Sequence, residues 1–209
     1  MRSLLFSLLF FTISWAHAGG GWISSGGGLF RDAHNPWFLK NVDKVYYCLE
    51  VDEPTFSIPL VEIRKEVQTS FQYWKSQFEK SRRLSADALV LGGQEFLETQ
   101  CDDPQLHLSF HFGYGTLSEE QVEHLKDPTR FIGVATRTSY DEKTLTGRGF
   151  IYISSDQGPK AFDNPGTLIK QAWSKPNLLR YALLHELGHV FGLPHSGNGL
   201  MAEVFLDHL

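Results

Sequence analysis

The chain has 209 residues, with 24 Asp and Glu against 19 Lys and Arg, and a formal net charge of −5 at pH 7. This length suits a single domain with a sizeable core, and the mild acidity argues against a nucleic acid as partner. After the N-terminal segment no apolar run is long enough to cross a bilayer, so we expect no membrane span.

The first 18 residues have the pattern of a secretory signal peptide. Arg2 supplies a positive charge, an apolar run follows over residues 4–13, and Ala16-His17-Ala18 forms an A-x-A cleavage site. The apolar run is too short for a membrane span, although a retained N-terminal anchor is the alternative. We expect cleavage after Ala18 and secretion to the extracellular space or the periplasm.

Residues 19–40 are expected to form an N-terminal arm that precedes a single domain of residues 41–209. The first half of the arm is rich in glycine, which is typical of a flexible segment. Its second half contains Trp37 and Phe38 beside a proline. Aromatic residues in such a setting usually dock on something, and we expect them to pack on the arm's own domain.

A strand and a long helix are predicted to open the domain. Residues 45–51 are rich in strand-forming types. In the helix that follows, apolar residues recur at intervals of four, four, three and four and so form one stripe. These residues are Ile63, Val67, Phe71, Trp74 and Phe78. We expect this stripe to pack against the sheet as core and not to hold a cofactor.

Cys48, in the first strand, and Cys101 are the two cysteines of the sequence. In an oxidising compartment an even count favours a disulfide, with two buried free thiols as the alternative. In the chain-entropy model, closing a loop of this length contributes about 4 kcal/mol.

Residues 106–112 alternate strictly between apolar and polar types, which predicts another strand. Its apolar residues would face the core, whereas His107, Ser109 and His111 would face the other side. We expect these histidines to be solvated, with a second metal site as the alternative. Further along, a short acidic helix is predicted near 118–126, followed by strands at 131–138 and 149–154.

The pattern H-E-x-x-H-x-x-G-x-x-H spans residues 185–195. On a helix His185 and His189 stand one turn apart and project to the same side, so both imidazoles can reach one metal ion. A catalytic zinc ion takes three protein ligands, and His195 is the natural third. Gly192 permits the left-handed turn that ends the helix and brings His195 back.

Glu186 lies beside these ligands and is expected to act as a base. A carboxylate next to a zinc-bound water can take its proton and later deliver it to a leaving amine. The alternatives are histidines that satisfy core hydrogen bonds or a closed structural zinc site, neither of which needs Glu186. The opposite side of the same helix carries an apolar stripe, formed by Leu179, Leu183, Leu187 and Val190. The helix should therefore bury one side and turn its histidines towards a cleft.

Together, these eleven residues resemble the extended zinc motif of the metzincin metallopeptidases. In that clan a methionine in a tight turn, the Met-turn, lies beneath the metal. Met201 matches it, because turn-forming residues 196–199 precede it at the right place. The serine directly after His195 and the run of residues 181–189 resemble the matrixin-like subgroup most.

The resemblance covers residues 45–201 in the order of elements, although only residues 185–201 are specific. It implies an α+β, metzincin-like zincin domain: a twisted, mixed five-stranded sheet with an antiparallel edge strand, and an active-site helix. Residues 131–138 would be the edge strand, along which an extended peptide substrate can pair. The alternative is an edge that faces water.

The same resemblance implies a secreted zinc-dependent endopeptidase with one catalytic Zn²⁺. We expect the protein to be a monomer. A structural Zn²⁺ or Ca²⁺ is the less favoured addition, because Asp156 and Asp163 lie in no calcium-loop pattern. The alternatives are a secreted zinc-containing binding module with weak or no turnover, and a zinc hydrolase that acts on a non-protein amide or ester.

Two features depart from the matrixin pattern. Only residues 202–209 follow Met201, whereas matrixins build their primed-side wall from residues after the Met-turn, so we expect a shallow and open primed side. Matrixins also commonly hold latency with a propeptide cysteine on the zinc, and no third cysteine exists here. One hypothesis for latency is that Asp32 or His34 of the arm binds the zinc and keeps the enzyme inactive until the arm is removed.

Overall fold

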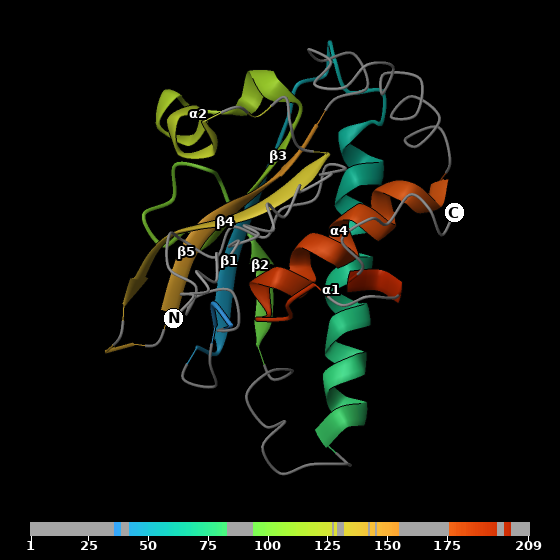
Figure 1. Cartoon of the computed structure of the whole chain (residues 1–209), viewed down its shortest axis with the longest axis vertical. Helices are drawn as coiled ribbons and strands as arrows, with labels where there is room; N and C mark the ends of the chain where they lie inside the picture. The colour runs from blue at the N-terminus through green and yellow to red at the C-terminus, as the bar shows by residue number, and fades with distance from the viewer. Residues whose placement is uncertain are drawn as a thin grey trace, which may run out of the picture.

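A five-stranded sheet with helices on both sides forms the described part of the chain (Figure 1). The structure is a computed structural model. It describes residues 36–38, 42–82, 94–126, 128, 132–141, 143–144, 146–154, 176–195 and 199–201. The predicted signal peptide, most of the predicted arm, Asp156, Asp163 and residues 202–209 lie outside these ranges.

The sheet is mixed, with one antiparallel pair. Its strands are β1 (Lys44–Val51), β2 (Glu95–Glu98), β3 (Leu108–Phe112), β4 (Gly133–Asp141) and β5 (Thr146–Ile153). They lie in the order β2-β1-β3-β5-β4, and only the β4–β5 pair is antiparallel. This arrangement confirms the expected mixed sheet with an antiparallel edge strand. The β4–β5 hairpin extends further than the sequence predicts and carries an irregularity between Arg137 and Ser139.

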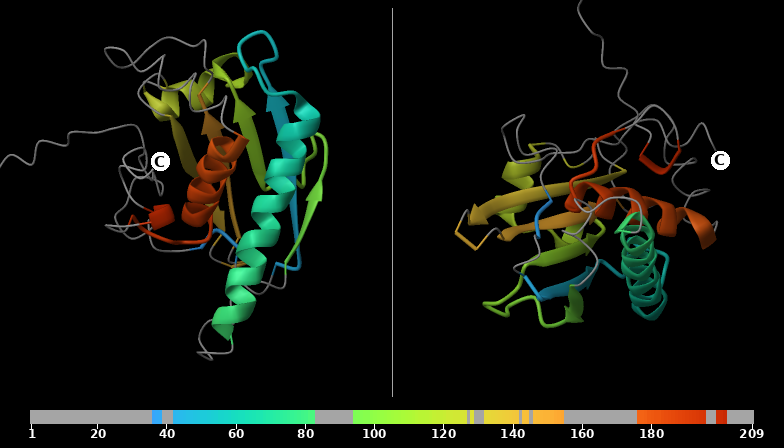
Figure 2. Two further views of the ribbon diagram at one scale, coloured as in Figure 1. Left: turned by 90° about the vertical axis from the view of Figure 1, so that its right-hand side faces the viewer. Right: turned by 90° about the horizontal axis from the view of Figure 1, so that it is seen from below.

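Two long helices cover one face of the sheet. They are α1 (Leu60–Arg82) and α4 (Pro176–Val190), while the short α2 (Glu119–Leu125) lies on the other side (Figures 1 and 2). The predicted stripe of α1 belongs to the core, with Ile63, Val67, Phe71 and Trp74 buried and Phe78 partly buried. The ring of Phe71 lies 5.9 Å from that of Phe110 on β3, which shows which face of the sheet α1 covers.

Side-chain contacts tie α4 to α1 at two levels. The indole Nε1 of Trp74 donates a buried hydrogen bond to the carbonyl of Leu184, at 2.9 Å. Nearer the start of α4, the guanidinium of Arg180 meets both carboxylate oxygens of Glu66, at 2.6 and 2.9 Å. The apolar stripe of α4 is buried along its whole length, at Leu179, Leu183, Leu187 and Val190. This part of the chain therefore has a fixed position on the sheet.

Trp37 and Phe38 dock on the domain as core residues. Trp37 is 2% exposed, and its backbone amide donates to the carbonyl of Val190 at the end of α4, at 2.9 Å. Phe38 is fully buried and bridges to Thr146 of β5. A Cβ at Gly149 would lie 2.7 Å from the Trp37 ring. The absence of a side chain at Gly149 therefore makes room for the indole. The hypothesis about Asp32 and His34 concerns residues outside the described ranges.

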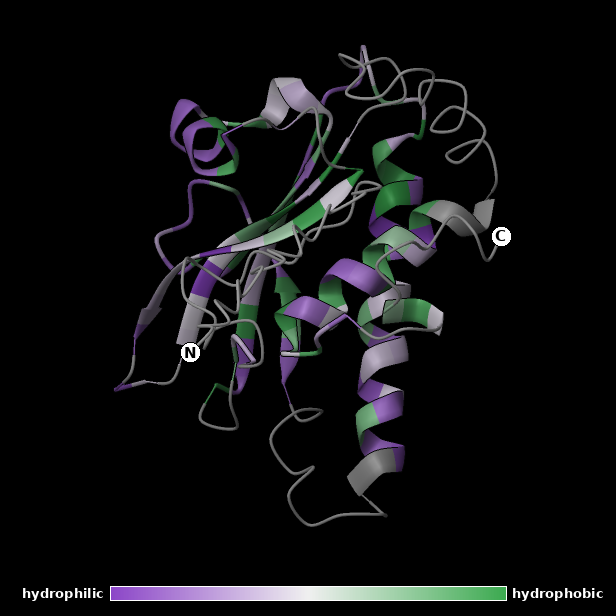
Figure 3. Cartoon of the chain, viewed as in Figure 1, coloured by the Kyte–Doolittle hydropathy of each residue, from purple (hydrophilic) through white to green (hydrophobic). Residues whose placement is uncertain are grey.

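The expectation that the polar side of β3 is solvated is wrong for two of its residues. His111 is 3% exposed and Ser109 is 9% exposed, and β3 is buried along its length. The reason is that α2 packs on this side, where Leu125 joins a second apolar cluster with Phe150 and Tyr152. The short α2 is itself mostly hydrophilic (Figure 3). Alternation along a strand cannot indicate whether a later element will cover its polar face.

No helix within the described residues combines the length and the hydropathy needed to cross a bilayer.

Cys48 and Cys101 form a disulfide, as expected, with their Cα atoms 5.2 Å apart and a sequence separation of 53. The bond links β1 to the segment that follows β2. A disulfide is typical of proteins that mature in an oxidising compartment.

We predict that replacing both cysteines by alanine lowers the free energy of unfolding by about 4 kcal/mol, because the unfolded chain regains the freedom of a long loop. Urea titration of the two proteins, followed by circular dichroism, measures this difference. A loss below about 1 kcal/mol would show that the loop is already restricted in the unfolded chain.

Candidate metal site

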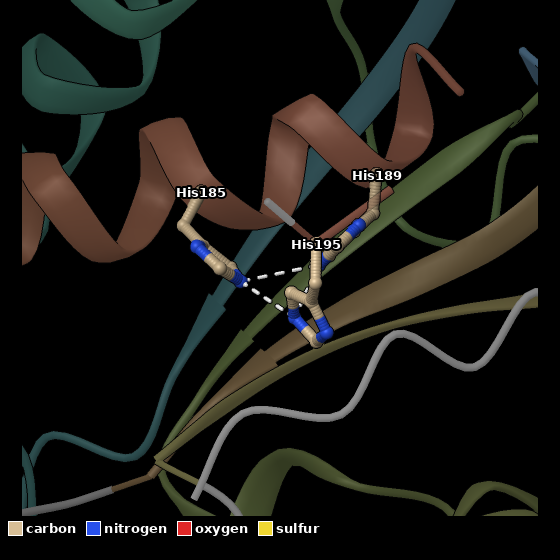
Figure 4. A group of neighbouring side chains, drawn as sticks. All are labelled: His185, His189 and His195. Atoms are coloured by element: carbon tan, nitrogen blue, oxygen red, sulfur yellow. Dashed lines mark hydrogen bonds between the residues drawn. The ribbon is translucent and has the colours of Figure 1, made fainter. Parts of the chain in front are cut away.

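Three histidine rings converge near the C-terminal end of α4 (Figure 4). His185 and His189 stand one turn apart on the helix, and His195 follows from the segment after it. Their Nε2 atoms form a nearly regular triangle, with 3.1 Å between those of His185 and His189 and 3.2 Å from each to that of His195. The chain therefore brings together the three residues that the motif selects.

The helix ends in a turn that returns the chain towards its own last residues. Gly192 has a φ of 82°, in the left-handed region that glycine adopts without strain. The amide of Gly192 donates to the carbonyl of His189, and the amide of Leu193 donates to that of Gly188, both at 2.9 Å. This pair of bonds is a Schellman motif. It directs the segment containing His195 back over the helix end.

Backbone carbonyls hold the two helical histidines in one orientation. The Nδ1 of His185 donates to the carbonyl of Leu200 at 2.7 Å, and the Nδ1 of His189 donates to that of Leu193 at 2.8 Å. Because a carbonyl can only accept, each Nδ1 carries a proton. Burial lowers the pKa of His185 to about 4 and that of His189 to about 3, so both rings are neutral at pH 7. Their Nε2 atoms are thus unprotonated and present lone pairs.

The geometry of these nitrogens fits a shared metal ion. The lone pairs of His185 and His189 face each other across 3.1 Å, and neither nitrogen can donate a hydrogen bond to the other. A cation between the rings removes this repulsion. Nitrogen atoms about 2.0–2.1 Å from a tetrahedral zinc ion lie about 3.3–3.4 Å apart, close to the observed spacing. The three residues can therefore hold a metal ion, and imidazole donors suit zinc among several transition metals.

Glu186 lies beside this cluster in full burial. Its side chain is 0% exposed, and neither carboxylate oxygen has a hydrogen bond of normal geometry among the described residues. Burial raises the pKa of this carboxyl well above its usual range, and the nearby amide of Ala135 on β4 opposes that rise only in part. A buried carboxylate without partners is costly, and a cation in the histidine cluster would offset this cost.

Access to the site is narrower than the sequence suggests. The histidine side of α4 is predicted to face a cleft, but His185 is 0% exposed and His189 is 5% exposed. Only His195 is partly exposed. The helix is therefore buried on both sides, with its apolar stripe against the core and its motif residues beneath β4 and the segment that contains Met201.

Gly188 is a site residue that the motif analysis did not single out. A Cβ at this position would lie 2.4 Å from the Sδ atom of Met201, which is itself 8% exposed. The thioether thus packs directly on the helix backbone between the two helical ligands. Met201 belongs to the short helix η5 (Gly199–Met201), whose Leu200 carbonyl orients His185. A glycine inside a helical pattern is the sequence signal for such close packing.

A scan of the sequence against protein-family models finds no match, and a search of curated proteins finds none that is significantly similar. Functional conclusions therefore depend on the motif and on the geometry of the site.

We predict that Gly188→Ala destabilises the protein by about 1–3 kcal/mol, because the added methyl group overlaps the sulfur of Met201. Helix propensity alone predicts the opposite sign, since alanine is the better helix former by about 1 kcal/mol. Displacement of Met201 would also move the Leu200 carbonyl, and we expect zinc affinity to fall about 10–100-fold. Thermal unfolding and a zinc competition titration measure the two effects.

A double variant with Met201→Ala separates steric overlap from other causes. If overlap is responsible, Gly188→Ala should cost less in the Met201→Ala background than in the wild type. Equal costs in both backgrounds would contradict this account.

Proposed function

We propose that the chain is a secreted zinc-dependent endopeptidase of the metzincin type. The observation that carries this proposal is the combination of three converging histidines with the fully buried carboxylate of Glu186, which directly follows His185 in sequence. A structural zinc site has no use for that carboxylate. The disulfide and the A-x-A pattern after the N-terminal apolar run support secretion.

In the proposed reaction the residues of the chain have separate tasks. His185, His189 and His195 hold the ion, which when bound polarises the substrate carbonyl and makes water more acidic. The Leu200 and Leu193 carbonyls keep the two helical rings in their ligating orientation. Glu186 accepts a proton from the attacking water and delivers it to the leaving amine as the peptide C–N bond breaks. The products are a carboxylic acid and an amine.

Strand β4 is the element proposed to align the substrate. Among the described strands it forms the edge of the sheet, next to β5. An extended peptide can pair with such an edge. Ala135 lies in β4 beside Glu186, which brings the edge close to the proposed base. The irregularity between Arg137 and Ser139 would confine regular pairing to the part of β4 before it.

One observation favours the alternative of a zinc-containing binding module. Glu186 and His185 are 0% exposed. Water and substrate can therefore reach them only if the surrounding residues move. A chain that retains the ligands but has lost efficient turnover would have such a site. The two functions differ in one measurable property, namely hydrolysis that depends on Glu186.

We predict that the purified chain from residue 19 to 209, loaded with zinc, cleaves a denatured generic protein and that Glu186→Gln lowers the rate by about 10²–10⁴-fold. The variant should retain its zinc, because Glu186 is no ligand. Its thermal stability should not fall, since a neutral amide replaces a buried carboxylate. Zinc content, gel-based cleavage and thermal unfolding are measured on the same samples.

A chelator should abolish cleavage by the wild type, and zinc should restore it. Cleavage that survives Glu186→Gln would refute the role of this residue as base. One bound zinc without cleavage by the wild type would instead support the binding module, and a panel of small amides and esters would then test for a non-protein substrate.

A further inference from the structure

A second group of polar side chains lies on the face of the sheet opposite to α1 and α4. Phe110 of β3 faces α1, so its neighbours Ser109 and His111 point to the other side, where α2 lies (Figure 1). Glu50 of β1 is paired in register with His111. The Nε2 of His111 is 2.9 Å from the Oγ of Ser109, and its Nδ1 is 3.1 Å from a carboxylate oxygen of Glu50.

The cap of α2 determines which nitrogen of His111 carries the proton. Ser118 caps this helix, and its amide donates to the Oε1 of Gln121 at 2.8 Å, which identifies Oε1 as the acceptor. The remaining polar atom of that side chain, Nε2, is a donor and lies 2.8 Å from the Nε2 of His111. The Nε2 of His111 must therefore accept, so a neutral His111 carries its proton on Nδ1.

The remaining contacts agree with this tautomer. The Nδ1 of His111 donates to the carbonyl of Thr116 at 2.9 Å and also lies within reach of Glu50. The hydrogen bond from His111 holds the pKa of the Glu50 carboxyl below its usual range, so Glu50 is ionised at pH 7. The Oγ of Ser109 lies 2.9 Å from the same Nε2, so its hydroxyl competes with the amide of Gln121 for the single lone pair of that nitrogen.

We propose that Ser109, His111 and Glu50 form a second, metal-independent reactive site, in which Ser109 is the nucleophile for small carboxylic esters. The order of hydroxyl, imidazole and carboxylate, with Nε2 towards the hydroxyl and Nδ1 towards the carboxylate, is the arrangement that activates a serine. His111 is the base, and Glu50 is a positioning residue. This site lies on the other face of the sheet from the histidine cluster.

The proposed acylation balances without an added co-reactant. The Oγ of Ser109 attacks the ester carbonyl carbon, and His111 takes the hydroxyl proton. When the bond between the carbonyl carbon and the alcohol oxygen breaks, His111 gives this proton to the departing alcohol. Water then attacks the acyl-serine with His111 again as base, and a carboxylic acid leaves while Ser109 regains its proton.

A cavity gives a small substrate access to Ser109. It has a volume of about 230 Å³, and its lining includes Ser109, Gln121, Arg148 and Gly149. The volume is below the range typical of drug-sized ligands, so the acyl group must be small. Once His111 has taken a proton on Nε2, the amide of Gln121 loses its acceptor there and is available to a developing oxyanion. The cavity thus borders the nucleophile and the donor, and the base His111 lies behind them, in contact with both.

The test is covalent labelling of the full secreted chain with a fluorophosphonate probe. Attack of the Ser109 oxygen on phosphorus releases fluoride, and His111 takes the proton. We expect one adduct by intact mass, mapped to Ser109 by peptide sequencing, and none in Ser109→Ala. Glu50→Gln should slow labelling at least tenfold, while Glu50→Asp restores part of the rate. Ser139→Ala, at a serine outside the network, is the matched control.

Labelling should be equal in wild type and Glu186→Gln and should persist with a chelator, which separates this proposal from the peptidase. A folded wild type without an adduct at Ser109 would overturn it and leave the network as an anchor for α2. If Glu50→Gln labels at the wild-type rate, Glu50 does not position His111, and the proposal that this network activates Ser109 is contradicted.

Discussion

The close approach of two unprotonated nitrogens is the constraint on which the site depends. The Nε2 atoms of His185 and His189 lie 3.1 Å apart, while the protons of both rings are on the far nitrogens. A ring that rotated away from this arrangement would leave a partly buried carbonyl without its donor, at a cost of at most about 1–3 kcal/mol. The backbone thus keeps two lone pairs opposed, and a shared cation is the group that makes the arrangement favourable.

This arrangement requires that α4 be fixed along its length. Arg180 meets Glu66 in its first half, the indole of Trp74 holds the Leu184 carbonyl, and the turn at Gly192 closes its end. The Arg180 side chain of this pair is 40% exposed, so the contribution of the pair to stability is small and its main effect is on the position of the helix. Met201 packs on Gly188, and this contact helps to position the carbonyl of the neighbouring Leu200, which accepts from His185. Each of these contacts acts on the backbone that supports the ligands.

The parts of the structure that the sequence predicts are those with local causes. The stripe of α1 follows from helical periodicity, the convergence of His185, His189 and His195 from a fixed spacing, and the disulfide from the cysteine count. The burial of His111 could not be predicted, because it depends on α2, an element that follows in sequence and packs back on the strand. The burial of Glu186 has the same origin, since β4 crosses over α4 from a distant part of the chain.

Glu186 is the residue that best separates a catalytic site from a structural one. In the metal-free protein its raised pKa means that ionisation costs stability, a cost that is absent at low pH and grows as the pH rises above the ordinary carboxyl pKa. A site that only bound zinc would gain from replacing this residue with an apolar one. A cation held by the neighbouring histidines would favour the ionised form, which is the form a base requires. The position is therefore unfavourable for stability alone and suitable for proton transfer, and that contrast supports a catalytic role.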